Sequence, residues 1–217
     1  LDLNNYVFTA TSISSSNSNS RTLAFGSSGA IYLTGTGSVT TLATSTNLTV
    51  TGTPNISLTY SGSTSRSIAI PTTGVTEANS LSFYVTAGTG DVSISGTSGR
   101  IRTLNFTGFT GTFSVFGTTS CTLYGDLIIV SGMTYSSTGT SIIFAATSGT
   151  KTINFANKTI GDYVTINGSG GTFQLGNNVT SSYATSPLTI TAGTLDLSGY
   201  TFTASAGSVY FNGGNLT

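Results

Sequence analysis

Apolar and polar residues alternate along most of this chain with a period of two. The alternation is clearest at residues 56–60, 81–85, 92–94, 188–190 and 209–211. Because successive side chains of a β-strand point to opposite faces, this pattern buries one face of each strand and exposes the other. The exposed positions are mostly Thr and Ser, whose side chains suit a pleated, solvated surface. The pattern predicts an all-β protein.

Glycine and asparagine lie between the alternating runs and predict turns. They occur at residues 35–37, 62, 88–90, 96, 168–171 and 176–178. Both residue types tolerate a positive φ, which lets a strand end in a sharp bend. The turn spacing predicts roughly seventeen short strands. No segment has the period of an amphipathic helix, and residues 72–79 are the best candidates for a helical turn or a protruding loop.

One phrase occurs twice, at opposite ends of the chain. Leu1–Ala10 returns as Leu195–Ala204, with seven of ten residues identical. The three positions that differ are turn positions or exposed strand positions. We therefore expect residues 1–217 to form a single elongated repeat domain, in which residues 195–217 start a second copy of the pattern at residues 1–23.

Two all-β architectures accommodate short strands separated by tight turns. A parallel β-solenoid, or β-helix, stacks them coil upon coil, whereas a β-sandwich arranges them in two antiparallel sheets. The repeated phrase, the many bends and the scarcity of charges favour the solenoid, with the sandwich as the alternative. The end coils of a solenoid expose strand edges, and this chain has few charges to protect them. The sequence therefore predicts association with copies of itself, end to end or as tandem repeats.

Charged residues make up only 6% of the chain, and six basic residues balance six acidic ones. Without clustered Lys and Arg, we expect no nucleic-acid partner. No apolar run approaches the length of a membrane-spanning helix, so we expect no membrane insertion. The apolar fraction of 37% and the aromatic fraction of 10% are too high for a disordered segment. The polar surface must therefore consist mainly of Ser, Thr, Asn and Gly.

The residue types that most enzymes need are missing or scattered. The chain has no histidine, which excludes Ser-His-Asp and Cys-His catalysis and removes a common zinc ligand. Cys121 lies in a strand-like run and is expected to be a small buried side chain rather than a nucleophile. We predict a protein that is not an enzyme, with no catalytic, cofactor-binding or metal-binding residues and no cofactor.

Three aspartates are candidates for metal binding or for carboxylate-based catalysis. Asp91, Asp126 and Asp162 each follow a glycine and precede an apolar strand, at spacings of 35 and 36 residues. They are candidates for calcium ligands or for the carboxylates of a polysaccharide-degrading β-helix enzyme. The basic residues that such an enzyme would use are Arg100, Arg102 and Lys151. The simpler interpretation is a turn residue that recurs once per structural unit.

Aromatic residues are assigned mainly to the core. The twelve Phe residues mostly occupy alternating positions, which predicts that they point inward. Candidates for exposed sugar-stacking platforms are Tyr32, Tyr84, Tyr135 and Tyr183. Packing against the edge of the core is the simpler interpretation for these tyrosines as well.

Three phrases resemble the strand-turn-strand phrases of very long, Ser/Thr/Gly-rich repeat proteins of bacteria and their phages. They are residues 21–26, 149–155 and 193–203. The resemblance implies a β-solenoid surface or fibre protein, similar in general plan to filamentous haemagglutinin, autotransporter adhesins and tail fibres. It implies no catalytic residue.

The expected function follows from the predicted architecture and this resemblance. The leading hypothesis is a structural repeat unit of an extracellular fibre or filament, located outside the cell, at the cell surface or on a virion. One alternative is an adhesin or phage receptor-binding module whose partners are cell-surface glycans. The other is the polysaccharide-degrading enzyme.

Overall fold

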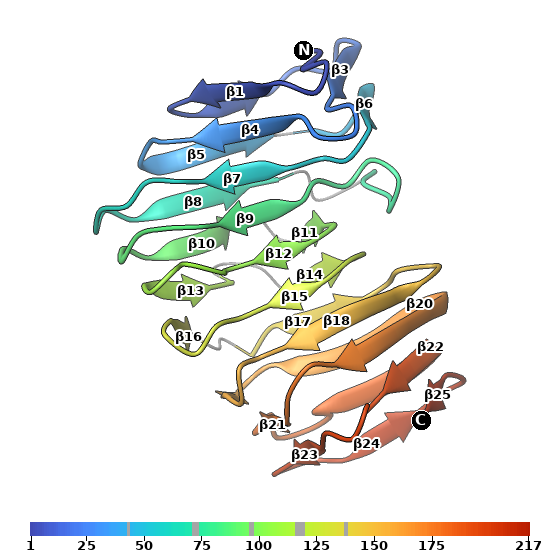
Figure 1. The fold of residues 1–217 in the computed structure, drawn as a ribbon. Coiled ribbons are helices and arrows are strands. Elements are labelled where there is room, and N and C mark those ends of the chain that lie inside the picture. Colours follow the sequence, from blue (N-terminus) through green and yellow to red (C-terminus); the bar gives the residue numbers. More distant parts are fainter. Residues whose placement is uncertain (43, 71–73, 96–97, 116–119, 137–138) are drawn as a thin grey trace.

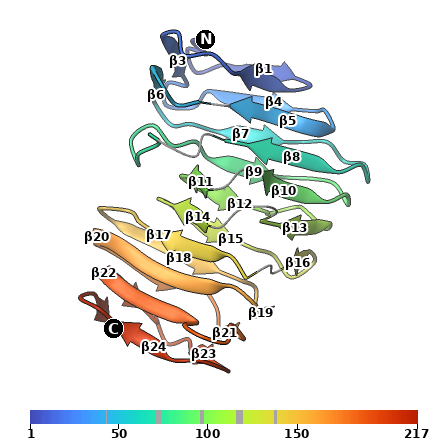
Figure 2. The ribbon, with the colours of Figure 1, turned by 180° about the vertical axis from the view of Figure 1, so that it is seen from behind.

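The chain forms an elongated stack of short parallel strands. The computed structural model describes residues 1–217 except 43, 71–73, 96–97, 116–119 and 137–138. This described part has no helix, and its strands stack as a β-solenoid of about nine turns, with the two termini at opposite ends (Figures 1 and 2). The predicted parallel β-solenoid is confirmed, and the β-sandwich alternative is wrong.

The strands lie on three faces of the solenoid. The first face comprises β1 (Val7–Ala10), β4 (Ala30–Leu33), β7 (Ile56–Leu58), β9 (Phe83–Val85), β12 (Leu104–Asn105), β15 (Leu127–Ile128), β18 (Thr150–Asn154), the second halves of β20 (Tyr163–Leu175) and β22 (Leu188–Asp196), and β25 (Asn215–Leu216). The second face comprises β2 (Ile13–Ser15), β5 (Gly37–Leu42), β8 (Arg66–Ala69), β10 (Val92–Ser95), β13 (Thr112–Ser114), β16 (Thr134–Ser136), β19 (Thr159–Ile160), β21 (Val179–Ser181) and β23 (Phe202–Ala204). The third face comprises β3 (Arg21–Ala24), β6 (Leu48–Thr51), β11 (Ser98–Ile101), β14 (Ser120–Leu123), β17 (Ser141–Phe144), the first parts of β20 and β22, and β24 (Val209–Phe211).

Apolar residues of successive coils stack in register inside the solenoid. On the first face, Ile31 pairs with Ile56, which pairs with Phe83. Measured on the first face, coil length varies from 21 residues between Phe83 and Leu104 to 27 residues between Ile56 and Phe83. In the core a coil packs mainly against its two neighbours, so a longer coil adds an outer loop without changing the core. The buried phenylalanines, as predicted, are Phe25, Phe83, Phe106, Phe109, Phe113, Phe144, Phe155 and Phe173.

The repeated phrase is a turn that joins two faces. In the first copy, the Asn4 amide donates to Asp2 Oδ1 (2.9 Å) and the Tyr6 amide to the Leu3 carbonyl (2.8 Å). The matching bonds of the second copy, each 2.8 Å, join Ser198 to Asp196 and Tyr200 to Leu197. The two residues at the bend have a positive φ in both copies, which explains why Asn, Ser and Gly occupy them.

The same turn recurs, and its copies do not share one place in the coil. Asn105 and Asn154 accept the same kind of bond from Thr107 (2.8 Å) and Ala156 (2.7 Å). Asp2 bridges to Ala24 on the third face, whereas Asp196 ends the part of β22 that lies on the first face. The phrase therefore repeats a local turn at two different corners. That residues 195–217 start a second copy of a longer unit stays a prediction.

Two long strands turn a corner without a loop. β20 and β22 each run from the third face to the first, and their register shifts between Ile166 and Thr172. At this corner Gly193 has φ +82°, and a Cβ there would lie 2.2 Å from the Gly168 carbonyl oxygen. Only glycine fits both the left-handed backbone and this close approach.

Other expectations about local structure need correction. The described residues form 25 strands, more than the roughly seventeen expected, because several strands have only two or three residues. Within residues 72–79, Glu77–Asn79 form a turn, while Thr72 and Thr73, like the turn residue Gly96, lie outside the described residues. No helix of the described chain is long and apolar enough to cross a membrane.

Candidate functional site

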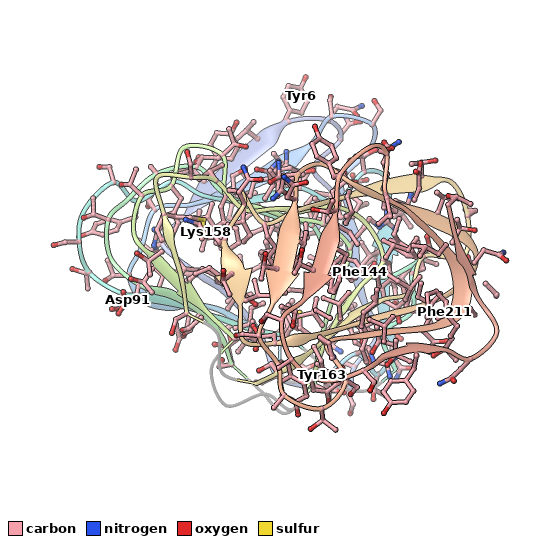
Figure 3. The ribbon with its side chains drawn as sticks, turned by 90° about the horizontal axis from the view of Figure 1, so that it is seen from below. Tyr6, Asp91, Phe144, Lys158, Tyr163 and Phe211 are labelled. Carbon is pink, nitrogen blue, oxygen red and sulfur yellow. The ribbon has the colours of Figure 1, made fainter. Side chains whose placement is uncertain are left out.

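The three candidate aspartates lie at three different corners of the solenoid. Asp91 precedes β10, Asp126 precedes β15 and Asp162 precedes β20. Their spacings of 35 and 36 residues fall between one coil and two, so stacking cannot align them. In the end-on view of Figure 3, Asp91 and Tyr163, the neighbour of Asp162, lie on different parts of the perimeter. Each aspartate occupies a turn before a strand, as the simpler interpretation predicts.

The described residues also contain no group of three or more His, Cys, Asp or Glu side chains that could hold a metal ion.

Asp162 organises the interior at its corner. Its side chain is buried, and it accepts hydrogen bonds from the Tyr135 hydroxyl (2.6 Å) and the Thr140 amide (2.7 Å). The Tyr135 ring packs between Phe113 (5.9 Å between centroids) and Phe155 (5.7 Å). Tyr135 therefore packs against the core, as the simpler interpretation predicted, and it is not an exposed sugar-stacking platform.

The other candidate tyrosines differ in exposure. Tyr183 packs against Tyr163 with ring centroids 4.8 Å apart. Tyr84 is half-buried on the first face, where it pairs with Ser57 and Asn105. Tyr32 is 39% exposed. Of the four candidate tyrosines, Tyr32 alone is exposed, so the four do not form a row of stacking surfaces.

Asp162→Ala is expected to lower the free energy of unfolding by about 2–4 kcal/mol, because it removes the buried oxygens that accept hydrogen bonds from the Tyr135 hydroxyl and the Thr140 amide. Asp162→Asn keeps an oxygen for the Thr140 amide and should cost less. Urea unfolding followed by circular dichroism measures both effects. Asp91→Asn, at an exposed turn, is the matched control and should change stability by less than about 0.5 kcal/mol. An alanine variant as stable as the wild type would contradict this role.

A groove runs along the corner between the third and first faces, from Glu77, between β8 and β9, to Lys151 on β18. We call it the corner groove. Its volume is about 470 Å³, and its lining includes Glu77, Arg102, Tyr124, Asp126, Ser148 and Lys151. Four of the twelve charged residues of the chain therefore lie around one hollow. This concentration of charge was not recognised in the sequence.

The loop of the longest coil closes one side of the corner groove. Glu77 Oε2 accepts hydrogen bonds from the amide (2.9 Å) and the hydroxyl (2.7 Å) of Thr147, seventy residues along the chain. The guanidinium of Arg102 donates to the carbonyls of Glu77 (2.9 Å) and Ala78 (3.1 Å). Together these bonds hold the loop against the three coils that follow it in the stack.

Arg100 on β11, two residues before Arg102, binds the same loop. Its guanidinium donates to the Val75 carbonyl (3.2 Å) and contacts the Tyr124 hydroxyl (3.3 Å). Arg100 and Arg102 are separated by the buried Ile101, so both point away from the core. The structure thus gives the two neighbouring arginines a structural role in positioning the loop.

Asp126 is fixed in the floor of the corner groove by its neighbours. A Cβ at Gly125 would lie 2.5 Å from Thr103 Oγ1 and 2.6 Å from the Arg102 carbonyl oxygen, so the chain passes close to the coil before it. Asp126 Oδ1 accepts a hydrogen bond from the Thr152 amide of the following coil (2.8 Å). Of the predicted enzyme residues, the structure brings together Asp126, Arg102 and Lys151, and leaves Asp91 and Asp162 elsewhere.

Cys121 lies inside the solenoid. It is 2% exposed on β14, where it pairs with Ile142 of β17. Burial, and secondarily the nearby Asp162, raises the pKa of this thiol to about 12. The side chain therefore stays protonated at neutral pH, and a thiol in that state is a poor nucleophile.

Comparison with protein families, curated proteins and solved structures found no match to this chain. The likeness to fibre and adhesin proteins therefore stays an expectation, and the functional argument depends on the geometry alone.

Proposed function

We propose that this chain is a structural segment of an extracellular β-solenoid fibre, in which further coils stack on both of its ends. The observation that carries the proposal is the distribution of exposed apolar side chains. Ten large apolar side chains are exposed among the described residues, and nine lie in the first and last coils. These nine are Leu1, Tyr6, Val7, Phe8, Tyr200, Val209, Tyr210, Phe211 and Leu216.

The first coil also leaves the interior open. A hollow of about 460 Å³ at this end is lined by inward-facing residues that include Ile13, Leu23, Leu42 and Leu48. Exposed apolar surface of this kind marks an interaction site in soluble proteins. Another coil stacked on this end would fill the hollow and pair with the free edge of β1.

The ends carry few charges that would oppose such stacking. Between residues 195 and 217 the only charged side chain is Asp196, and between residues 1 and 24 there are only Asp2 and Arg21. Natural proteins often protect open strand edges with charges, especially Lys. The scarcity of charge here supports continued stacking, by further coils of the same chain or by another copy.

The test uses two end variants, Phe8→Lys and Phe211→Lys. The wild-type chain is expected to form elongated oligomers as its concentration rises, measured by analytical ultracentrifugation and electron microscopy. Stacking of one end on the other joins two different surfaces, so blocking either end should stop growth. A mixture of the two variants keeps one intact surface of each kind and should form pairs only.

Thr107→Lys, at an exposed position on the flank, is the matched control and should assemble like the wild type. A wild-type chain that stays monomeric at all concentrations, or a mixture that forms no pairs, would contradict end-to-end stacking.

A further inference from the structure

We propose that the corner groove binds a neutral saccharide, recognised through its hydroxyl groups. The groove lies on the flank of the solenoid between Glu77 and Lys151, away from both ends, so this binding would be independent of stacking. Its volume of about 470 Å³ is within the range of small-molecule sites, roughly 300–1,000 Å³. A ligand of a few sugar rings fits a hollow of that size.

The charge balance of the corner groove argues for a neutral ligand. Glu77 and Asp126 contribute two carboxylates, and Arg102 and Lys151 contribute two cations. The site therefore has no net charge, which gives neither an anion nor a cation an electrostatic advantage. Hydroxyl groups both donate and accept hydrogen bonds, so those of one ligand can donate to the carboxylates of the groove and accept from its cations at the same time.

Each carboxylate of the groove has a second oxygen that can accept hydrogen bonds from a ligand. Within the described part of the chain, the hydrogen bonds to the Glu77 carboxylate use Oε2, and the hydrogen bond to the Asp126 carboxylate uses Oδ1. Oε1 of Glu77 and Oδ2 of Asp126 are left to accept bonds from ligand hydroxyl groups. The ammonium group of Lys151 can donate to a hydroxyl or ring oxygen, with Ser148 beside it on the same wall.

The corner groove is held in shape before any ligand binds. The Glu77 carboxylate, the Arg102 guanidinium and the Thr147 backbone fix the loop on one side. The Thr152 amide fixes Asp126 on the floor. A site that is already ordered loses less conformational entropy on binding, which favours a small polar ligand that buries little apolar surface.

The test measures binding of defined oligosaccharides to the chain by isothermal titration calorimetry and saturation-transfer NMR. The neutral probes are oligosaccharides of glucose, galactose, mannose and N-acetylglucosamine. The charged probes are oligogalacturonate, an anion, and oligoglucosamine, a cation. At least one neutral probe is expected to bind, and more tightly than either charged probe.

Two variants locate the binding. Asp126→Asn keeps the oxygen that Thr152 uses and replaces the free acceptor with a donor, so it should weaken binding at least about tenfold while leaving the fold intact. Lys151→Met removes the ammonium group and should also weaken binding. The matched controls, Asp91→Asn and Lys158→Met, make the same chemical changes outside the groove and should bind like the wild type. The end variant Phe211→Lys should bind normally, which separates this inference from the stacking proposal.

Three results would overturn the inference. One is that no neutral probe binds to a correctly folded chain. Another is that a charged probe binds more tightly than every neutral one. The third is that Asp126→Asn and Lys151→Met bind the neutral probe as well as their controls do.

Discussion

Phe106→Ala is expected to lower the free energy of unfolding by about 4 kcal/mol. This value is near the middle of the range for replacing a buried phenylalanine with alanine, which leaves a cavity in the core. Phe106 is completely buried beside β12, in the middle of the stack. Its ring lies 4.5 Å from that of Phe113 and 5.7 Å from that of Phe109, between centroids. Removing the ring therefore takes away both buried apolar area and two aromatic contacts.

Phe8→Ala is the matched control for this change. Phe8 lies on β1 in the first coil and is 42% exposed, so its removal should cost at most about 1 kcal/mol. Urea unfolding measures both variants. Hydrogen exchange adds a spatial prediction. Because the core side chains of a coil pack mainly against the neighbouring coils, Phe106→Ala should reduce protection most in the coils beside it. Equal costs for the two variants would contradict the importance of the central aromatic contacts.

The strands and the core could be predicted from the sequence, because the alternation of apolar and polar residues indicates directly which side chains are buried. In β10, Val92 and Ile94 are buried, whereas Ser93 between them is half-buried. Stacked coils repeat the same inward positions, so each buried residue meets another apolar residue above and below. This local pattern predicted the all-β class, whereas the repeated phrase, the many bends and the scarcity of charge only favoured the solenoid over the sandwich.

The corners and the coil length could not be predicted in the same way. β12 and β15 have two residues each, too few for any alternation to be seen. Measured on the first face, coil length varies between 21 and 27 residues, so no single period links equivalent positions. The recurring turn that begins at Asp2 and Asp196 adds to the difficulty, because the same phrase serves two different corners.

The corner groove depends on contacts that no local pattern encodes. Glu77 reaches Thr147 across three coils, and Asp126 meets Thr152 of the next coil. These contacts depend on the register of every coil in between. The sequence feature that came closest to indicating these contacts was the pair Arg100 and Arg102. They flank one buried residue, so their side chains point to the same side of the strand. Their target, the backbone of the long loop, could not be known before the coils were stacked.

Cys121 is expected to make the protein less stable in alkali. In the unfolded chain the thiol has its ordinary pKa of 9.0, and burial raises the pKa to about 12 in the folded chain. Below pH 9 the thiol is protonated in both states, and its full contribution to stability is present. Between pH 9 and pH 12 only the unfolded chain loses the proton, so stability falls as pH rises. Three pH units correspond to a loss of about 4 kcal/mol.

Cys121→Ala tests this contribution. The fall in the free energy of unfolding between pH 8 and pH 11, measured by urea unfolding at intervals of one pH unit, should be smaller in the variant by about 2–3 kcal/mol. Some fall will remain, because burial and the neighbouring Asp162 also raise the pKa of Tyr135 well above its ordinary value. Tyr200→Phe, which changes an exposed tyrosine of the last coil, should leave the wild-type profile unchanged. Parallel pH profiles for the wild type and Cys121→Ala would show that the buried thiol does not control alkaline stability.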